Sequence, residues 1–594
     1  MSLRALLLGL LLLGAPPARA LDWPPGGLLV LCYHDVVDNL RQSRDPTAVA
    51  SRELAAQFAW LRGHGYTPVG LDDVLKARRG EKPLPERAVL LTFDDGYRSV
   101  YTRAFPLLKA FNFPAVVTLV GRWMDAAPGA TISYGEGEVP REAFLSWAEV
   151  NEMVRSGLVE AASQTYDLHH GVPGNPQGNL QPAAGTRIYD AARGAYEDEA
   201  AHRARLRADL ARAAVQIERR TGRPPRAIAW PYGNFGLEAA AIAAENGMTI
   251  GFSLEDGVNG PDQPVHALKR LLIVGFPTSK DLAVEIAAPP ARAPLRTVRV
   301  ELDALYSPDA GERERRLSRL LERIRELSIN AVLLHATADT DGNGAADAAY
   351  FPNRHLPLRA DLFNRTAWQI LSRTGARVYA RMPVLAFEHG PAPRADAKRA
   401  SLPSPAAPET GRFVEELYDD LARHAHFQGL LFGADANAGA SFELIERLTE
   451  RVRAARYPLK TARELDAGIL AAPAGPARFG ETLQEYTRRY DWTLAVTPGP
   501  AGDAARFLEP LETLATQLPA AFDRTVIELF AGDPRTGSQV PAQTLAEYMR
   551  RFQRRGAIHF GYRTDDFLNE RPAIEAVAPA MSLRAYPQER AGVR

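Results

Sequence analysis

Cysteine is almost absent from this sequence, because Cys32 is the only one in 594 residues. A single thiol cannot form a disulfide within the chain, and a metal site built from several cysteines is excluded. One unpaired cysteine fits an oxidising compartment. Net charge is absent too, since 71 Lys and Arg balance 71 Asp and Glu. The whole chain therefore shows no basic bias towards nucleic acid, and we expect no nucleic-acid partner.

Long apolar runs are missing after the N-terminus. Arg4 precedes an apolar run from Leu6 to Leu13, and residues 15–20 read A-P-P-A-R-A. This order is typical of a secretory signal peptide that is cleaved after Ala20. The alternative is a membrane anchor, but the run is too short to span a bilayer comfortably. We therefore expect an exported, soluble mature protein in a periplasm.

The order of apolar segments indicates two α/β domains. Short apolar runs alternate with helical periodicity through the first half, which predicts a parallel sheet or barrel. A Pro/Ala-rich stretch at 287–294 then separates the halves. Seven further strand candidates over about 300 residues fit a second (β/α) barrel. These candidates are Val298–Leu302, Ala331–His335, Val378–Met382, Gly429–Phe432, Thr493–Val496, Val526–Phe530 and Ala557–Phe560.

The stretch that organises the first half is Ala88–Tyr97, A-V-L-L-T-F-D-D-G-Y. A buried apolar strand runs directly into Asp94-Asp95-Gly96, at the strand end where α/β folds bind ligands. Two adjacent carboxylates repel each other unless a cation or a shared proton relieves the repulsion. One of them can hold a metal while its neighbour acts as a base. A solvated Asp-Asp-Gly turn is the simpler alternative.

Other polar residues follow the predicted strands of the same half. His34, His169 and Pro231-Tyr232-Gly233 each come just after an apolar run. An Asp with His side chains can form a divalent-metal site that keeps positions open for water and substrate. A free Asp can then deprotonate water, and a His can protonate a leaving group. The set suits amide or ester hydrolysis.

Together these motifs resemble those of the polysaccharide deacetylases of carbohydrate esterase family 4. The closer resemblance is to the exported poly-β-1,6-N-acetyl-D-glucosamine N-deacetylases. The resemblance implies that Asp94 is the catalytic base and that His34, in Tyr33-His34-Asp35, is the general acid. It implies a divalent metal (zinc, or cobalt, nickel or iron) with Asp95 and His169 among its ligands. The residues that it places along the substrate groove are Arg226, Trp147, Pro231, Tyr232 and Gly233.

Gln164 departs from the family pattern. The family's metal motif is Ser-His-Thr-Tyr with a second His five residues after the first, whereas this chain has Ser163-Gln164-Thr165-Tyr166 before His169. An amide oxygen is a weak, neutral ligand for zinc-like metals, which prefer imidazole. We expect metal affinity and activity to fall at least tenfold, by analogy with losses of ~10–100-fold for ligand-supporting residues. The alternatives are that Gln164 still coordinates or that a water takes its place.

The second half resembles the second domain of the same proteins, a glycoside-hydrolase-like barrel. Glycosidases need two carboxylates that flank the scissile bond. Asp435 is present after the strand Gly429–Phe432, but Ala434 and Ala440-Ser441 stand where the resemblance implies further acids. We therefore expect a sugar-binding cleft that includes Asp435, and an active glycosidase is the alternative for this half.

These inferences define one expected architecture and two functions. We expect a signal peptide at 1–20, a polysaccharide deacetylase (NodB-like) domain at 21–286, a linker at 287–296 and a TIM-like barrel at 297–594. The expected fold is α/β, a distorted deacetylase barrel followed by the second barrel. The expected function is metal-dependent N-deacetylation of poly-β-1,6-N-acetyl-D-glucosamine during biofilm exopolysaccharide export, with an outer-membrane export protein as partner and a place peripheral to the outer membrane. The alternative is a weakly active or inactive polysaccharide-binding protein of the export complex, which Gln164 favours.

Overall fold

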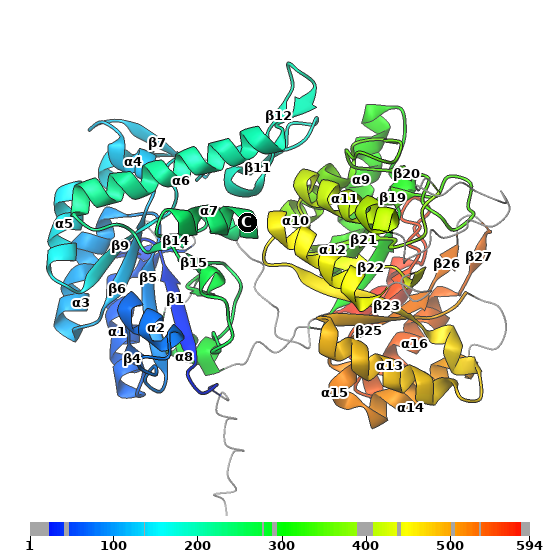
Figure 1. Cartoon of the computed structure of the whole chain (residues 1–594). Coiled ribbons are helices and arrows are strands. Elements are labelled where there is room, and N and C mark those ends of the chain that lie inside the picture. The colour runs from blue at the N-terminus through cyan, green and yellow to red at the C-terminus, as the bar shows by residue number, and fades with distance from the viewer. Residues whose placement is uncertain are drawn as a thin grey trace, which may run out of the picture. The chain divides into compact units, whose positions relative to one another are not determined.

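The computed structural model describes residues 23–40, 47–135, 137–275, 278–287, 294–388, 408–435, 441–499, 505–533 and 536–583. The predicted signal peptide with Ala20, and most of the predicted linker, lie outside these ranges. Within them, no helix combines the length and the apolar character needed to cross a membrane. The chain forms two compact units, shown in Figure 1. The first comprises Met1–Gln164, Ala213–Ala229 and Gly247–Ala291, and the second comprises Thr165–Arg212, Trp230–Asn246 and Arg292–Arg594.

The first unit is built on one parallel sheet that curves into a half-barrel. Its strand order is β15-β14-β9-β6-β5-β1-β16, and β4 pairs with β5. Alternate residues of β1 and β5 pack into two different apolar clusters, so both faces of the sheet are buried. Strands buried on both faces read as continuous apolar runs. The bounds are β1 Leu28–Tyr33, β4 Thr67–Pro68, β5 Ala88–Phe93, β6 Ala115–Leu119, β9 Val159–Ser163, β14 Ala227–Ala229, β15 Ile250–Phe252 and β16 Leu271–Leu272.

Helices of the first unit cover this sheet. The α-helix Phe105–Phe111 is preceded by a π-helical turn, Val100–Ala104. The helices are α1 Ser51–Gly63, α2 Leu71–Arg78, α3 Phe105–Phe111, α4 Gly121–Asp125, α5 Trp147–Arg155 and α8 Ser279–Ala287. The long helix α6, Glu199–Thr221, begins in the residues of the second unit and ends in those of the first.

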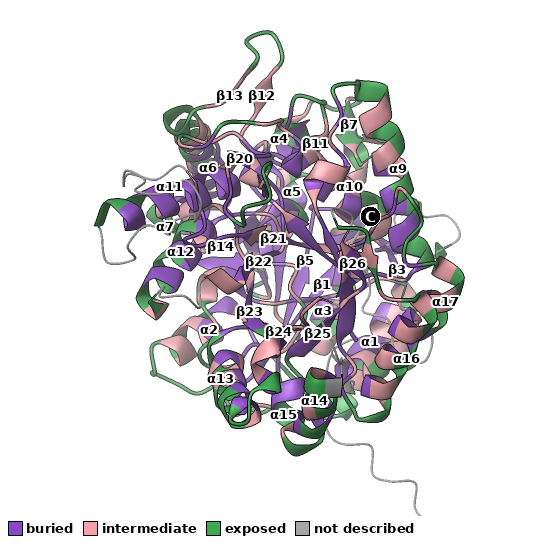
Figure 2. Cartoon of the chain, turned by 90° about the vertical axis from the view of Figure 1, so that its right-hand side faces the viewer, coloured by how far each residue is buried: buried purple, intermediate pink, exposed green. Residues whose placement is uncertain are grey.

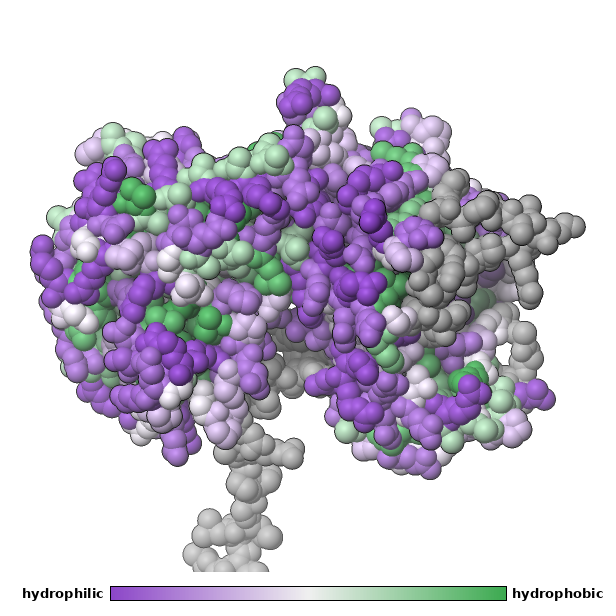
Figure 3. Space-filling view, viewed as in Figure 1, coloured by the Kyte–Doolittle hydropathy of each residue, from purple (hydrophilic) through white to green (hydrophobic). Residues whose placement is uncertain are grey.

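The second unit contains a closed barrel of eight parallel strands. In Figure 2 its strands are buried and its helices expose their outer faces, and in Figure 3 hydrophilic residues cover much of the visible surface. The predicted two-barrel α/β class is confirmed. The strands are β17 Arg296–Val300, β18 Ala331–His335, β21 Arg377–Met382, β22 Gly429–Phe432, β23 Lys460–Asp466, β24 Trp492–Val496, β25 Thr525–Phe530 and β28 Phe560–Arg563. The larger helices are α9 Ala310–Glu326, α10 Phe363–Thr374, α11 Pro408–His424, α12 Phe442–Ala455, α13 Gly475–Arg489, α14 Ala505–Gln517 and α16 Ala542–Arg554.

The barrel interior carries a layer of four charged side chains. They come from alternate strands, as a layer in this fold requires: Arg299 from β17, Arg381 from β21, Glu464 from β23 and Glu528 from β25. Arg299 donates to Glu528 at 2.9 Å and pairs with Glu464 at 2.7 Å, and Arg381 donates to Glu464 at 2.7 Å. Glu464 and Glu528 are 2% and 0% exposed. Buried charges persist in a fold when they are paired and hydrogen-bonded in this way.

Candidate active site

Asp94 follows β5 and lies inside an ion pair. Its carboxylate accepts from the Arg270 guanidinium at 2.8 Å, and both side chains are almost fully buried. The Thr118 hydroxyl lies 3.1 Å from the same carboxylate, and the Cys32 thiol lies 3.6 Å from it. Arg270 precedes β16, which pairs with β1, and β1 also pairs with β5. Parallel pairing therefore brings a basic and an acidic residue from distant parts of the sequence into contact.

Asp95 adopts a left-handed backbone conformation, with φ +68°. Asp tolerates this region better than most residues. Its backbone N–H donates to the Gln164 Oε1 at 2.7 Å, and its Oδ1 accepts from the Gln164 Nε2 at 2.7 Å. The Tyr134 hydroxyl donates to the other carboxylate oxygen. The Thr118 hydroxyl also lies 3.0 Å from the Gln164 oxygen. Gln164 thus contacts Asp95 through both its carbonyl and its amino group.

Gln164 does not fit the role of a metal ligand. Its oxygen already accepts from the Asp95 backbone N–H, and its amino group, which faces the Asp95 carboxylate, can only donate. The predicted metal site of Asp95, His169 and Gln164 therefore lacks one of its three ligands. The structure supports the expectation that the position is poor for a metal and adds the physical reason.

His34 lies beside the buried Asp94. Cys32, His34 and Asp94 form a candidate metal-binding triad, because one ligand atom from each lies within 4.8 Å of the others. Burial raises the pKa of Cys32 well above its usual range, which disfavours the thiolate that binds metals. Arg270 already neutralises Asp94. The Nδ1 atom of His34 is buried and finds no hydrogen-bond partner in the described ranges.

Two predicted groove residues of the first unit lie in different places. Trp147 begins α5, and the backbone N–H of Leu145 donates to the Gly96 carbonyl at 2.8 Å, so this segment borders the Asp94–Gly96 turn. Arg226 precedes β14, at the amino end of the strand, and the Glu160 carboxylate accepts from it at 2.7 and 2.8 Å. Glu160 is four residues before Gln164 along an extended segment, about 13 Å at ~3.3 Å per residue. We therefore leave Arg226 out of the site.

His169 and Pro231-Tyr232-Gly233 belong to the second unit. The rings of His169 and Tyr232 lie 4.9 Å apart, and Tyr232 is 48% exposed in a left-handed conformation with φ +57°. Asp209 on α6 accepts from the backbone N–H groups of Tyr166 and Asp167 at 2.9 and 2.7 Å. It thereby fixes the segment that carries His169. Asp209 was not predicted, because an acid within a charged helix gives no signal of its contacts in the sequence.

Asp435 follows β22 in the second unit. Its Oδ2 accepts from three consecutive backbone N–H groups, those of Val384, Leu385 and Ala386, at 2.7, 2.7 and 3.0 Å. This carboxylate oxygen anchors the loop after β21.

Glu464 is a buried acid of the barrel interior. Burial alone would raise its pKa, but the neighbouring arginines outweigh burial and hold the pKa well below its usual range. A glycosidase acid needs a raised pKa, so Glu464 is unsuited to that role.

Comparison with known proteins gives two family matches and several relatives. The chain matches the polysaccharide deacetylase family over residues 81–251 and the hypothetical glycosyl hydrolase family 13 over residues 299–443 and 438–563. The poly-β-1,6-N-acetyl-D-glucosamine N-deacetylase of Escherichia coli (strain K12) is 34% identical over 633 residues, which cover 95% of this chain and 93% of that protein.

Solved structures from Bordetella bronchiseptica resemble each half. The deacetylase domain of BpsB is 46% identical and covers 42% of this chain and 98% of that domain, with a TM-score of 0.39. The PgaB (BpsB) glycoside hydrolase domain is 29% identical and covers 49% of this chain and 99% of that domain, with a TM-score of 0.42.

Proposed function

Because the chain belongs to the poly-β-1,6-N-acetyl-D-glucosamine N-deacetylase family, we propose that it removes N-acetyl groups from poly-β-1,6-N-acetyl-D-glucosamine. The predicted family and enzyme class, a polysaccharide N-deacetylase of carbohydrate esterase family 4, are confirmed. Hydrolysis of the amide releases acetate and exposes an amine on the sugar. The observation that carries the proposal is the buried Asp94 carboxylate, held by Arg270 at the end of β5 where the family's motif lies.

Asp94 and His34 take the two proton-transfer roles. Asp94 accepts the proton of the attacking water, and Arg270 and Thr118 fix the direction of its carboxylate. His34 protonates the departing nitrogen, since its ring lies beside Asp94 and its Nδ1 is uncommitted within the described ranges. Trp147, Pro231, Tyr232 and Gly233 are proposed to contact the sugar.

Metal dependence is general in this esterase family. In this chain Asp95 and His169 are the predicted ligands other than Gln164, and two protein ligands hold a zinc-like metal more weakly than three. We assign no catalytic step to a metal here, because Gln164 does not fit the site. Impaired turnover follows from the same observation.

The second barrel is proposed to bind the partly deacetylated polymer. Glu464 and Glu528 are held by arginines, which argues against their use as the carboxylates of a glycosidase. With a deacetylase domain over 21–286 and this barrel over 297–594, the protein would act in the periplasm beside an outer-membrane export protein. The identity of that partner, the cleavage of the signal peptide and the metal are parts of the proposal.

Acetate release from β-1,6-linked N-acetylglucosamine oligomers tests the function. The full chain is assayed with zinc, cobalt or nickel, beside Asp94→Asn and the surface variant Glu138→Gln as a matched carboxylate-to-amide control. We expect acetate from the chain and from Glu138→Gln, and none above background from Asp94→Asn. Equal rates for all three would contradict the role of Asp94. No acetate in any condition, together with retained polymer binding, would establish the polysaccharide-binding alternative.

A further inference from the structure

We propose that Gln164 replaces the metal structurally, by holding the Asp94-Asp95 turn closed with its own side-chain amide. This proposal rests on the proposed function in one respect only, namely that the family places a metal ligand at position 164. The remaining steps depend on hydrogen-bond geometry within the first unit.

The orientation of the Gln164 amide is fixed by a backbone group. Oxygen and nitrogen of a side-chain amide are normally assigned from their partners. Here the partner is the Asp95 backbone N–H, which can only donate, so the atom 2.7 Å from it must be the oxygen. The amino group must then face the Asp95 Oδ1, also at 2.7 Å.

Asp95 is satisfied without a cation. Gln164 donates to one carboxylate oxygen and Tyr134 donates to the other. Asp95 and Gln164 are each 3% exposed. A buried carboxylate is stabilised either by a cation or by several donors. In this chain the donors are already in place, so folding of the turn does not require a metal.

Histidine at position 164 could not reproduce both contacts. Gln164 offers an acceptor to the Asp95 backbone and a donor to the Asp95 carboxylate from the two arms of one planar group. A neutral imidazole has one donor and one acceptor on opposite sides of its ring. It would leave one Asp95 group unpaired or bind a metal with its free nitrogen. The two residues therefore represent alternative solutions, a hydrogen-bonded turn and a metal-bound turn.

Metal content and thermal unfolding test this inference without activity. The full chain is dialysed against zinc or nickel, its bound metal is counted, and its Tm is measured with and without EDTA. We expect far less than one equivalent of metal and the same Tm in both conditions. In Gln164→His we expect at least tenfold tighter binding, by analogy with ~10–100-fold effects of supporting residues, and a Tm that rises when metal is added.

Two further variants keep the test decisive. Gln164→Ala removes both hydrogen bonds to Asp95 and should lower the Tm in a way that added metal does not reverse. Gln216→His adds an imidazole at another glutamine of the same unit and should leave the Tm independent of metal. One tightly bound equivalent in the unchanged chain, with a Tm that falls on chelation, would overturn the proposal. A failure of acetate release alone would overturn the proposed function and leave this inference standing.

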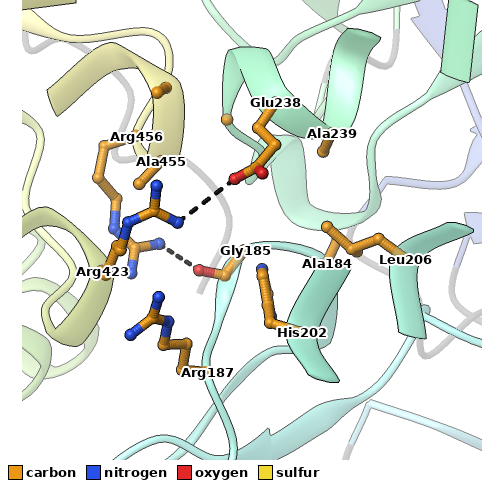
Figure 4. A pocket seen from close by; sticks show the side chains of 12 residues that line it. Ala184, Gly185, Arg187, His202, Leu206, Glu238, Ala239, Arg423, Ala455 and Arg456 are labelled. Atoms are coloured by element: carbon orange, nitrogen blue, oxygen red, sulfur yellow. Dashed lines mark hydrogen bonds and ion pairs between the residues drawn. The ribbon is translucent and has the colours of Figure 1, made fainter. Parts of the chain in front are cut away.

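An independent observation comes from a pocket in the second unit, shown in Figure 4. It is partly open to solvent, and Arg187, Arg423 and Arg456 line it. Arg423 is paired, with Asp419 at 2.9 Å and Glu238 at 3.4 Å. The other two guanidinium groups have much weaker counter-charges.

Arg187 and Arg456 lack close carboxylates among the described residues. The nearest carboxylate to Arg187, that of Glu199, is 4.0 Å away, and the buried Nε of Arg187 has no hydrogen-bond partner there. Arg456 is 4% exposed and donates to the carbonyl groups of Ala422 and Gly185. Burial, with Arg187 and Arg423 nearby, lowers the pKa of Arg456 to about 9. Among the residues that line this pocket, three arginines therefore accompany a single carboxylate, that of Glu238.

We infer that the pocket binds a small oxyanion, with Arg187 and Arg456 as its donors. Guanidinium groups match the geometry of carboxylate and phosphate oxygens. Acetate, which the proposed reaction releases, and inorganic phosphate share this chemistry and are separate arms of the test.

Thermal unfolding at constant ionic strength measures the binding. We expect acetate or phosphate to raise the Tm of the chain by about 2–4 °C over chloride, because a ligand that binds only the folded state stabilises it. Arg187→Gln should lose the rise, and Arg451→Gln, an exposed arginine of the same unit, should keep it. If Arg187→Gln fails to fold, Arg187→Lys retains the charge without the forked donors and should reduce the rise. An equal rise in all variants, or none over chloride, would overturn the inference.

Discussion

Replacement of Arg270 by Met tests whether the buried ion pair organises the site. Arg270 and Asp94 are 1% and 2% exposed, and the guanidinium lies 2.8 Å from the carboxylate. The variant leaves a buried carboxylate without its counter-charge, which costs about 3–5 kcal/mol. For a domain of ~150–250 residues, this corresponds to a fall in Tm of about 6–20 °C. Urea unfolding of the full chain, followed by a probe in the first unit, measures the loss.

A matched arginine of the same unit serves as the control. Arg226 pairs with Glu160 and Asp72, but its side chain is 34% exposed. Exposed pairs contribute ~0–1 kcal/mol each, so Arg226→Met should cost about 1 kcal/mol. The double variant Asp94→Asn with Arg270→Met should lose less than the sum of the single variants, with a coupling of about 0.5–3 kcal/mol. Additive losses, or a loss in Arg270→Met no larger than in Arg226→Met, would refute the reasoning.

Two further predictions concern the second unit. Burial and Arg456 lower the pKa of His426 well below its usual range, so the unfolded state binds the proton more readily. The stability that neutral His426 contributes should be fully present above about pH 6.5 and fall as the pH drops below it. His426→Gln should flatten this pH dependence in urea titrations at pH 7 and 5. Asp435→Ala should destabilise the barrel by about 1–3 kcal/mol, because three backbone N–H groups lose their acceptor. Asp435→Asn keeps an acceptor oxygen and should lose less stability. A change in polymer affinity with unchanged stability would instead give Asp435 a direct binding role.

The sequence predicted those parts of the fold that local pattern determines. Seven of the eight barrel strands were predicted from short apolar runs, although the predicted Ala557–Phe560 overlaps β28 at Phe560 alone. The eighth, β23 at Lys460–Asp466, was missed because its charged residues interrupt the apolar pattern. The structure shows why charge is tolerated there: Glu464 faces the arginines of the barrel interior. A strand whose inward-facing residue forms an ion pair cannot be recognised from hydrophobicity alone.

The candidate site shows the same limit. Asp94 and Asp95 were predicted as site residues because the strand and the turn adjoin in the sequence. Arg270 was missed because it lies 176 residues from Asp94 and reaches it only through the pairing of β16 with β1. Gln164 was recognised as a departure from the family, but its two contacts with Asp95 join residues 69 positions apart, which the sequence does not reveal. Arg226 was expected in the groove from the family resemblance, whereas carboxylates hold it at the amino end of β14.

The charged layer inside the barrel has a consequence for how the second unit responds to temperature. Exposure of polar surface on unfolding lowers the heat-capacity change, whereas exposure of apolar surface raises it. The penalty for burying ions also decreases on heating, because hydration of charged groups becomes less favourable. Arg299, Arg381, Glu464 and Glu528 should therefore give the barrel a flatter stability curve than an apolar interior of the same size would.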